Sequence, residues 1–365
     1  MPKVEYIISY HSGFQSVSQV DRSRVYELLL RCVFPEDRAA LRELYDLLIP
    51  EELRMIKDYF IIPDGELLHF NFEQLLDPED VFLIHSKNIR YAYSAIIYQY
   101  QQELGRRGKQ GGNILAITPG FSTTMKDVYM DYYPETSVDS AWLYFIQQPF
   151  LIGLAQNLDQ YHRTKNLLHL EATEDSFKKH AKDFRVIHLG TYGIIDENSP
   201  LFSRLIFAKD SIEDGYLHTY EIYGQQMEAD LAVLMACETG AGAYTTGEGV
   251  VSLVHAFTHA GCPSVLMSLW KIDEKSSAEI IERFYGYLYK GKRKSMALKL
   301  AKLDYLKNAP RELQDPYYWA GLTIMGSDVP IYHSSSRVWW LIGMLIFISG
   351  GLFLFFRRRV NRRVN

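Results

Sequence analysis

Cysteine is scarce in this chain of 365 residues, and an excess of positive charge is absent. The three cysteines, Cys32, Cys237 and Cys262, are too few and too widely spaced for a disulfide framework or a zinc site. Cys32 lies in an apolar helical pattern and Cys262 precedes a proline, so we expect both to be structural. With a net charge of −5, the chain lacks the excess of basic residues that nucleic-acid-binding domains usually have, which argues against a nucleic-acid partner.

A phosphate-binding loop is also missing. The glycine-rich stretch 105–112 does not have the spacing Gly-x4-Gly-Lys-Ser/Thr that cradles a nucleotide. His255 and His259 are four residues apart on an expected helix, but no third metal ligand is evident. We therefore expect no metal ion and no other cofactor. Packing or solvent exposure is the expected role of both histidines, and an approach of one of them to Cys237 is the alternative.

What the sequence does contain is a regular alternation of strand and helix patterns from residue 166 onward. Apolar residues make up 47% of the chain, which is enough for a large core. The stretch 231–235 is apolar at every position, which is typical of a strand buried on both faces. The pattern predicts an α/β fold with a mostly parallel sheet between helix layers. The strands expected at 185–191 and 231–237 then end at the same edge of that sheet.

The remaining elements are predicted from local patterns. The expected strands are 4–10, 82–85, 113–119, 203–208, 264–270 and 317–325, with a hairpin at 58–70 that turns at Pro63-Asp64-Gly65. The expected helices are 22–33, 38–48, 91–106, 141–158, one beginning at Thr173, and 219–226, 247–260, 273–289 and 294–307.

Cys237 is the candidate nucleophile. It ends an apolar strand, and a turn rich in glycine follows it at 240–249. The alternative is a buried cysteine with no chemical role. A free thiol has a pKa near 8.5, so only a few per cent of it is thiolate at neutral pH. A hydrolase that uses a cysteine nucleophile therefore needs a base beside the thiol.

Tyr192 ends the neighbouring strand, at the place where that base belongs. A phenol has a pKa near 10 and is a poor proton acceptor, so we expect Tyr192 to pack or to contact a substrate, with a catalytic role as the alternative. The backbone N–H groups of Gly193 and Cys237 are candidates for an oxyanion hole. His188 lies four residues before Tyr192, about 13 Å away along a strand, and is expected to be a core histidine that hydrogen-bonds to the backbone.

Three carboxylates lie near this expected site edge and are candidates for binding a basic substrate side chain: Glu238, Asp273 and Glu274. The alternative for each of them is a solvated or helix-capping carboxylate. Asp273 and Glu274 open an expected helix, where acidic side chains complement the helix dipole.

The C-terminal part predicts a single membrane span. Residues 338–356 are uncharged and long enough to cross a hydrocarbon layer of about 30 Å, and a linker at 329–337 precedes them. A basic tail follows at 357–365. Basic residues beside a span favour the cytoplasmic side, which would place the large domain on the other side of the membrane. The N-terminus carries no secretory signal, which instead favours a cytoplasmic domain, and we favour that side slightly. The sequence leaves the orientation open.

Several ordered motifs between residues 4 and 327 resemble the CHAT domain, a caspase-related peptidase module kin to separases. Residues 63–76 resemble the family's hairpin, and 185–193 resemble its motif "RVIHLATHG". Residues 236–250 resemble "ACETG…GEGV". Residues 268–274 resemble the turn "SLW-VDD", and 316–320 resemble the closing motif "HPYYWA".

The resemblance implies a caspase-like three-layer α/β/α sandwich, with an N-terminal pseudo-caspase half at 1–165 and a C-terminal half at 166–328. It places the nucleophile at Cys237, the oxyanion donors at Gly193 and Cys237, and the family's basic histidine at Tyr192. The tetratricopeptide repeats that often precede such domains are not found, so a separate repeat-containing regulatory subunit or a truncated gene start is expected.

Three functions stay open on this basis. The first is a membrane-anchored protein with impaired or lost proteolysis that binds peptides or protein partners. The second is an active cysteine endopeptidase with Cys237 as nucleophile and a base from another histidine or a partner. The third is a non-catalytic membrane scaffold.

Overall fold

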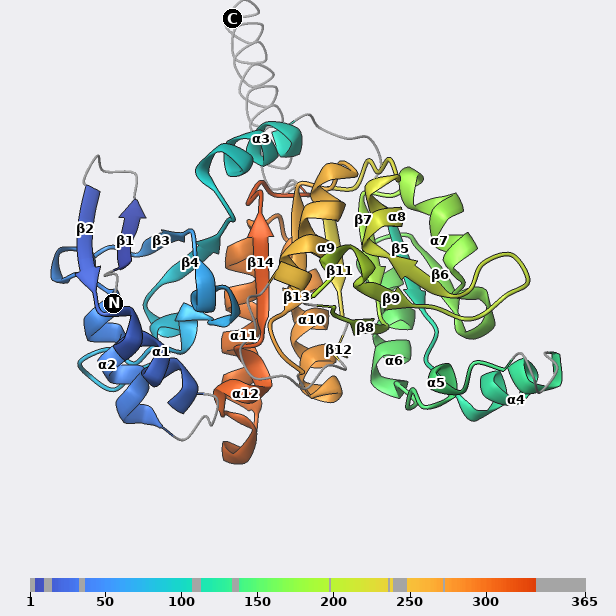
Figure 1. Ribbon diagram of the computed structural model, residues 1–365, viewed down its shortest axis with the longest axis horizontal. Helices are drawn as coiled ribbons and strands as arrows, with labels where there is room; N and C mark the ends of the chain where they lie inside the picture. The colour runs from blue at the N-terminus through green and yellow to red at the C-terminus, as the bar shows by residue number, and fades with distance from the viewer. Residues whose placement is uncertain are drawn as a thin grey trace, which may run out of the picture.

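A large mixed sheet forms the centre of the molecule (Figure 1). The computed structural model describes residues 4–9, 15–32, 37–106, 113–132, 138–196, 198–235, 237–238, 248–271 and 273–332. Within these residues the sheet has eight strands. In spatial order they are β3 (Asp58–Ile61), β4 (Asn88–Tyr91), β14 (Leu322–Gly326), β13 (Ser264–Ser268), β11 (Leu231–Leu234), β7 (Val186–Leu189), β5 (Ile114–Thr118) and β6 (Thr164–Leu168).

The sheet consists of two parallel blocks joined at one antiparallel pair. Strands β13, β11, β7, β5 and β6 run parallel to one another, and β3, β4 and β14 form the second parallel block. The pair β13–β14 is antiparallel, with Ser268 opposite Leu322. The prediction of a mostly parallel sheet is confirmed. The N-terminal ends of β4 and β14 consequently lie at the edge where β13, β11 and β7 have their C-terminal ends.

Two smaller sheets accompany the large one. The order of the four-stranded sheet is β10 (Tyr216–His218), β9 (Arg204–Ile206), β8 (Tyr192–Ile194) and β12 (Cys237–Glu238). The antiparallel pair β1 (Val4–Ser9) and β2 (Gln15–Val20) forms the other. The four-stranded sheet contains the candidate site residues Tyr192 and Cys237, because β8 and β12 continue the chain from β7 and β11.

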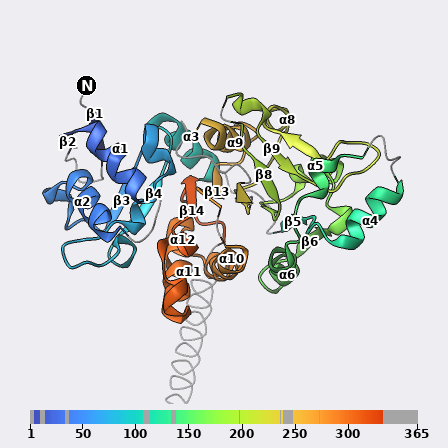
Figure 2. The ribbon, with the colours of Figure 1, turned by 60° about the horizontal axis from the view of Figure 1, so that its bottom comes forward.

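Helices cover both faces of the large sheet (Figure 2). One face packs against α1 (Arg22–Arg31), α2 (Arg38–Leu48), α7 (Glu174–His180), α8 (Thr219–Tyr223) and α9 (Glu248–His259). The other packs against α6 (Pro149–Asn157), α10 (Glu274–Tyr289) and α11 (Lys294–Asn308). The remaining helices are α3 (Ala95–Arg106), α4 (Thr123–Tyr132), α5 (Ser140–Leu143) and α12 (Pro316–Trp319).

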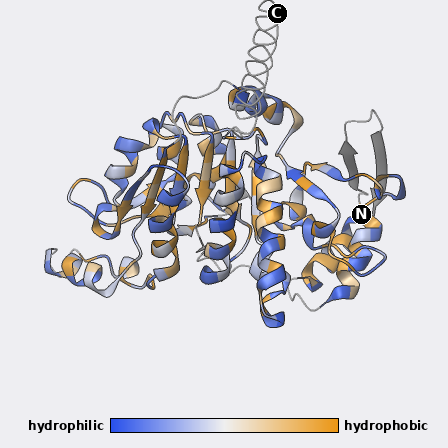
Figure 3. Cartoon of the chain, turned by 180° about the vertical axis from the view of Figure 1, so that it is seen from behind, coloured by the Kyte–Doolittle hydropathy of each residue, from blue (hydrophilic) through white to orange (hydrophobic). Residues whose placement is uncertain are grey.

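Alternation along each strand explains the two helix layers. In β11, Ala232 and Leu234 belong to one core cluster, and Leu231 and Val233 belong to the other. All four side chains are at most 3% exposed. A strand whose successive side chains point to opposite faces must be covered on both sides when all of them are apolar. Figure 3 shows that the central strands are mostly hydrophobic.

Polar caps set where several helices begin. Asp37, Thr173 and Asp273 each accept a backbone N–H bond from the first turn of α2, α7 and α10. Such a cap satisfies one of the donors that a helix N-terminus leaves unpaired, and is worth about 1 kcal/mol. The predicted starts of these helices agree with the structure to within one residue.

Four local predictions are wrong. The expected hairpin at 58–70 is β3 followed by the 3-10 helix η2 (Gly65–His69), and β3 pairs in parallel with β4. The expected strand at 82–85 is the 3-10 helix η4 (Leu83–His85), and the strand comes later, as β4. The helix expected at 141–158 is divided into α5 and α6, and the expected strand 317–325 begins with α12.

The domain division and the membrane span stay predictions. The boundary expected between residues 165 and 166 falls within β6, and segments on both sides of it supply strands to the large sheet. Within the part of the chain that the structure describes, no helix combines the length and hydropathy needed to cross a bilayer. The stretch 338–356 lies outside the described residues.

Candidate active site at the edge of the sheet

Tyr192 and Cys237 lie directly opposite each other on two paired strands. The neighbouring parallel strands β7 and β11 both end at the same edge of the large sheet, and the chain then continues into β8 and β12. These two strands pair in parallel, with Cys237 opposite Tyr192 and Glu238 opposite Gly193. The expectation that both strand ends reach one edge is confirmed. The side chains of Cys237 and Glu238 lie outside the described residues.

Close packing guides the chain from β7 into β8 at Gly190. A Cβ atom at this position would lie 2.7 Å from Thr118 Oγ1 and 3.4 Å from Leu151 Cβ. Thr118 is fully buried at the end of β5, so it has no room to move away. A glycine at position 190 therefore lets β7 and β5 stay side by side up to the edge that carries Tyr192.

The Tyr192 side chain is a core residue in this structure. It is 6% exposed and packs against Phe121 and Phe145, with ring centroids 5.3 and 5.0 Å away. Its hydroxyl donates a hydrogen bond to the carbonyl oxygen of Ile146, at 3.2 Å. Buried tyrosines usually find such a partner for the hydroxyl. The phenolic proton is thus directed at the backbone of the segment between α5 and α6.

A small aromatic core surrounds this position. Its buried members come from the loop after β5, from α4 and α5, from β8, and from β9 and the residues that follow it: Phe121, Met125, Tyr129, Trp142, Tyr192, Ile206 and Ala208. Trp142 anchors it by donating from Nε1 to the carbonyl oxygen of Phe207, at 2.9 Å. The segment 138–148 therefore covers Tyr192 and contributes directly to the site.

The sequence did not indicate this aromatic segment. Phe121 directly follows Pro119-Gly120 at the end of β5, and the aromatic run from Trp142 to Phe145 lies in a stretch without clear periodicity. The position of this segment follows from the parallel pairing of β5 with β7, because the loop after β5 then reaches the edge of the sheet that carries Tyr192. That inference requires the strand order, which local patterns do not provide.

Gly193 belongs to two strand ladders. It lies opposite Leu205 of β9 and Glu238 of β12. Its role as an oxyanion donor stays a prediction, as does the nucleophilic role of Cys237.

Asp273 and Glu274 lie at the same edge, where α10 begins after β13. Asp273 caps α10 by accepting the Ser276 N–H at 2.8 Å. Glu274 Oε1 accepts the N–H groups of Phe150 and Leu151, at 2.7 and 3.1 Å, and so caps α6. Burial raises the pKa of the Glu274 carboxyl. Both carboxylates stabilise helix N-termini, and substrate binding by them or by Glu238 stays a prediction.

His188 is buried in the core, as expected. Its Nδ1 lies 3.2 Å from the Tyr285 hydroxyl, so its partner is a side chain and not the expected backbone group. Nε2 has no hydrogen-bond partner among the described residues. Burial lowers the pKa of His188 to about 3, and the ring is therefore neutral at physiological pH.

His255 lies toward the edge of the sheet opposite Cys237. Its ring packs edge-on against Tyr93, with centroids 4.7 Å apart, and burial lowers its pKa. Tyr93 follows the C-terminal end of β4. In the sheet, Tyr91 of β4 lies opposite Met325, and Met325 lies opposite Val265 at the start of β13. This end of β4 is therefore at the N-terminal edge of β13. His259 packs near Tyr223 at 5.4 Å. The two histidines thus pack against different aromatic rings.

The other two cysteines are placed as expected. Cys262 is fully buried, and its Sγ donates to the carbonyl oxygen of Ser264 at 3.2 Å. Cys32 is half-buried at the end of α1, and burial raises the pKa of its thiol to about 12. Neither thiol is prepared for nucleophilic chemistry.

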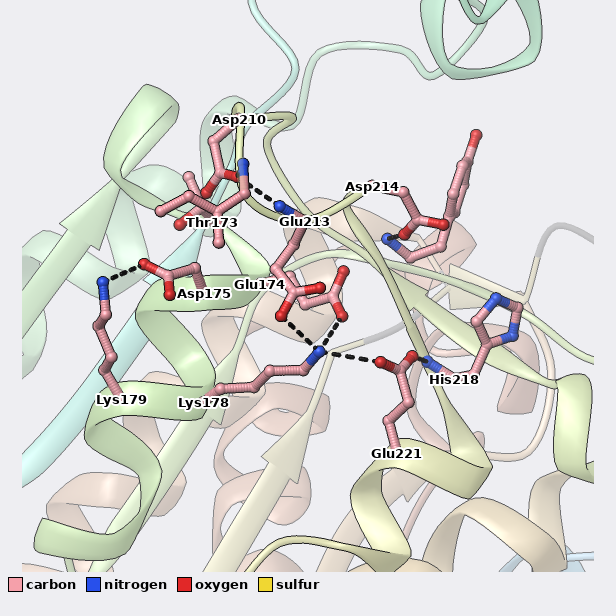
Figure 4. A network of polar contacts seen from close by, with 12 residues as sticks. Thr173, Glu174, Asp175, Lys178, Lys179, Asp210, Glu213, Asp214, His218 and Glu221 are labelled. Atoms are coloured by element: carbon pink, nitrogen blue, oxygen red, sulfur yellow. Dashed lines mark hydrogen bonds and ion pairs between the residues drawn. The ribbon is translucent and has the colours of Figure 1, made fainter.

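One group of carboxylates in the described residues has a spacing that could hold a metal ion: Glu174, Glu213 and Glu221 (Figure 4). The Lys178 ammonium lies between them, 2.7, 2.8 and 2.9 Å from one oxygen of each. The ammonium group has three N–H bonds, and each can donate to one of the three carboxylates. We therefore interpret the cluster as an ion-pair network that joins α7, α8 and the loop before β10.

A second buried ion pair joins the N-terminal segment to α11. Lys302 is fully buried and forms an ion pair with Glu73, 2.5 Å away, and a hydrogen bond with the carbonyl oxygen of Leu322, at 2.6 Å. Asn71 donates to the carbonyl oxygen of Ala320 at 2.6 Å. The motif Phe72-Glu73-Gln74-Leu75-Leu76 therefore has a structural role, because it attaches this segment to α11 and to the start of β14.

Comparison with known proteins identifies the class. A family model described as "CHAT domain" matches residues 38–327, and this chain belongs to that family. The sequence also matches tetratricopeptide repeat protein 28 of Homo sapiens, with 30% identity over 127 residues, and of Mus musculus, with 31% over 106 residues. These matches cover 35% and 29% of this chain but only 5% and 4% of the two relatives.

The chain is also similar to solved structures. The separase–securin complex of Saccharomyces cerevisiae matches with 14% identity and a TM-score of 0.45, over 74% of this chain and 16% of that chain. The arginine-specific cysteine proteinase gingipain R, RgpB of Porphyromonas gingivalis, matches with 8% identity and a TM-score of 0.45, over 82% of this chain and 70% of that chain.

Proposed function

We propose that this chain is a membrane-anchored CHAT protein of caspase-like cysteine endopeptidase fold whose peptidase activity is impaired or lost. It acts by binding a peptide or a protein partner at the edge of the sheet. The observation that carries the proposal is the pairing of Cys237 with Tyr192, whose hydroxyl is a donor to the Ile146 carbonyl.

The proton balance at Cys237 supports this proposal. A cysteine hydrolase forms a bond from sulfur to the scissile carbonyl carbon, so the thiol must first give up its proton to a base. A phenol with an ordinary pKa near 10 holds its own proton at neutral pH. His188 is enclosed in the core, and the His255 ring packs against Tyr93 toward the opposite edge, and both positions argue against these histidines as the base.

Binding without cleavage uses the same edge. An extended peptide docks beside strand ends through main-chain hydrogen bonds, and this needs no proton transfer. As partner we propose a separate tetratricopeptide-repeat subunit, supported by the likeness of this chain to part of a protein named for such repeats. A pull-down with the tagged full chain from its own cells tests that choice.

Labelling with peptide probes tests the proposed function. We expect no labelling of the full chain by electrophilic peptides that carry Arg, Lys or Asp at the leading position. A Tyr192→His variant should gain labelling, because an imidazole with a pKa near 6.5 accepts a proton at neutral pH and a phenol does not. Tyr192→Phe is the matched control, since it keeps the ring but adds no base, and it should stay unlabelled.

The remaining outcomes separate the rival functions. Labelling of the parent that disappears in Cys237→Ala means an active endopeptidase and contradicts the proposal. If Tyr192→His folds with a cooperative melting transition but is still not labelled, the chain is a scaffold without a latent catalytic site. Labelling of Tyr192→His that persists when Cys237→Ala is added assigns the reaction to another residue.

A further inference from the structure

A cavity of about 710 Å³ opens on the same side of the molecule as Cys237, yet apart from it. It lies between the start of α2, the 3-10 helix η4, the end of α11 and the start of α12. Helix η4 precedes β4 and α12 precedes β14, so both lie at the C-terminal edge of β13 and β11. Figure 1 shows α12 and β12 on this side of the sheet. The volume is in the range of about 300–1,000 Å³ that ligand pockets occupy.

Positive charge gathers around this cavity. Arg38, Lys307 and Arg311 line it together with His85, and Asp315 is the acidic side chain among its lining residues. The concentration is unexpected in a chain with a net charge of −5.

Among the described residues, two of these cations have no carboxylate partner. Arg38 forms an ion pair with Asp80 at 2.7 Å. In the part of the chain that the structure describes, neither Lys307 nor Arg311 has an ion pair or a side-chain hydrogen bond, and both are exposed. Fixed positive charges at the mouth of a cleft attract an anionic ligand and raise its local concentration.

The wall of the cavity is apolar. Phe82, Leu303 and Leu306 line it, and the Arg38 guanidinium lies 5.5 Å from the centre of the Phe82 ring. These side chains belong to the hydrophobic packing between η4 and α11 and are partly buried. A ligand that fits must therefore offer an apolar group to the wall and negative charges to the rim.

We propose that this cavity binds an acidic peptide segment of a partner protein, in which Asp or Glu residues flank one aromatic or leucine side chain. Charge complementarity with Lys307 and Arg311 selects the carboxylates, and the Phe82 wall takes the apolar side chain. Nucleic acid would need an extended basic surface, and the two rim cations that have no carboxylate partner among the described residues, Lys307 and Arg311, are fewer than such a surface requires. The proposal goes beyond the function at Cys237, since the ligand binds whether or not the thiol is reactive.

A hydrogen bond joins the edge of the cavity to the turn after β13. Trp270, which follows β13, donates from Nε1 to the carbonyl oxygen of Tyr317 at 3.2 Å, and Tyr317 directly follows the cavity residue Pro316. Strands β13 and β11 are neighbours, with a spacing of about 4.8 Å. A partner held in the cavity is thereby positioned on the side of the sheet where Cys237 lies.

Fluorescence anisotropy with the full chain tests the proposal. The probe is a labelled decapeptide in which glutamates flank one phenylalanine, and the control peptide has glutamine in place of every glutamate. We expect the acidic peptide to bind more tightly than the control, and added salt to weaken its binding. The double variant Lys307→Glu/Arg311→Glu should bind it about tenfold more weakly or worse, because two attractive rim charges become repulsive.

A matched variant at the other end of α11 controls for net charge. Lys292→Glu/Arg293→Glu changes the total charge equally, but about 20 Å away from Lys307 along the helix, and should bind like the parent. Both double variants alter exposed side chains, so both should keep the parent's melting temperature and its labelling behaviour at Cys237.

Three outcomes overturn the proposal. The first is equal binding by the parent and by Lys307→Glu/Arg311→Glu. The second is equal binding of the acidic and glutamine peptides. The third is binding of anionic lipid vesicles through Lys307 and Arg311 when the peptide does not bind, which would assign the cavity to a membrane surface. None of these depends on whether Cys237 reacts with a probe.

Discussion

Tyr192 donates its hydroxyl proton to a backbone carbonyl, and this bond limits what the side chain can do for Cys237. An ordinary phenol is deprotonated in about one molecule in a thousand at neutral pH. The ring is also held between Phe121 and Phe145. A side chain held in this way contributes packing energy and a fixed donor, which are useful for binding and not for removing a proton from sulfur.

Glu174 provides a residue-scale prediction about pH. Its side chain is 1% exposed, its Oε2 has no hydrogen-bond partner among the described residues, and burial raises the pKa of the carboxyl to about 7. Lys178 opposes this shift, but the nearby Glu221 and Glu213 add to it. The folded protein therefore binds this proton more tightly than the unfolded chain, whose carboxyl has a pKa near 4.5.

The stabilisation from this proton is complete below about pH 4.5 and is lost as the pH rises through about 7. We expect the free energy of unfolding in urea to fall by on the order of 1–3 kcal/mol between pH 5 and pH 8 through this group. Glu174→Gln, which mimics the protonated form, should remove that part of the slope. Asp175→Asn, on the same helix turn, should keep it. An unchanged slope in Glu174→Gln would show that Glu174 does not hold the proton.

Among the elements, those with strong local signals could be predicted. Helix α2 has Asp37 as its cap and a regular apolar face, and its predicted bounds are those of the structure. Strand β11 is apolar throughout, and its burial on both faces follows directly. In both cases residues within the element determine the result, because the cap and the periodicity are local.

Elements that depend on distant partners were missed. Pro63-Asp64-Gly65 is a strong turn signal, and Gly65 has a φ of 55°, but the turn opens a 3-10 helix and does not close a hairpin. The partner of β3 is β4, which begins 27 residues after the last residue of β3 and runs parallel to it. Parallel pairing needs a long crossover, which the sequence between two strands does not reveal.

For the site, the sequence was sufficient to place Cys237 and Tyr192 at one edge but not to find their surroundings. The pairing follows from two apolar strands ending in neighbouring parallel positions. The contacts of Tyr192 with Phe121, Phe145 and Ile146 come from segments whose position depends on β5 lying beside β7. That information resides in the strand order, which is a property of the whole chain.

In the whole molecule, the large sheet takes its strands from both the N-terminal and the C-terminal parts of the described chain. The N-terminal segments supply β3 and β4 at one side and β5 and β6 at the other, and the C-terminal segments supply the four strands between them. The antiparallel pair β13–β14 reverses the strand direction near the middle. This reversal brings the basic cavity and the candidate active site to the same side of the sheet.

Anchoring by 338–356 is a prediction about the whole chain. We expect the full chain to remain in the membrane pellet after extraction with alkaline carbonate, since about 19 uncharged residues are long enough to span the bilayer. A variant that lacks residues 337–365 should appear in the supernatant as a folded protein. Full chain in the supernatant would contradict the anchor, and a shortened variant that stays in the pellet would show a further membrane contact.

The reactivity of the Cys237 thiol as a function of pH tests the central claim most directly. The rate of alkylation by iodoacetamide is measured from pH 5 to pH 10 on the full chain, and the rate of Cys237→Ala is subtracted as the contribution of Cys32 and Cys262. Without a neighbouring base, the midpoint should lie at or above about pH 8.5, and Tyr192→His should move it below about 7.5. A midpoint below about 7.5 in the unaltered chain would show that Cys237 already has a base, and would contradict the account.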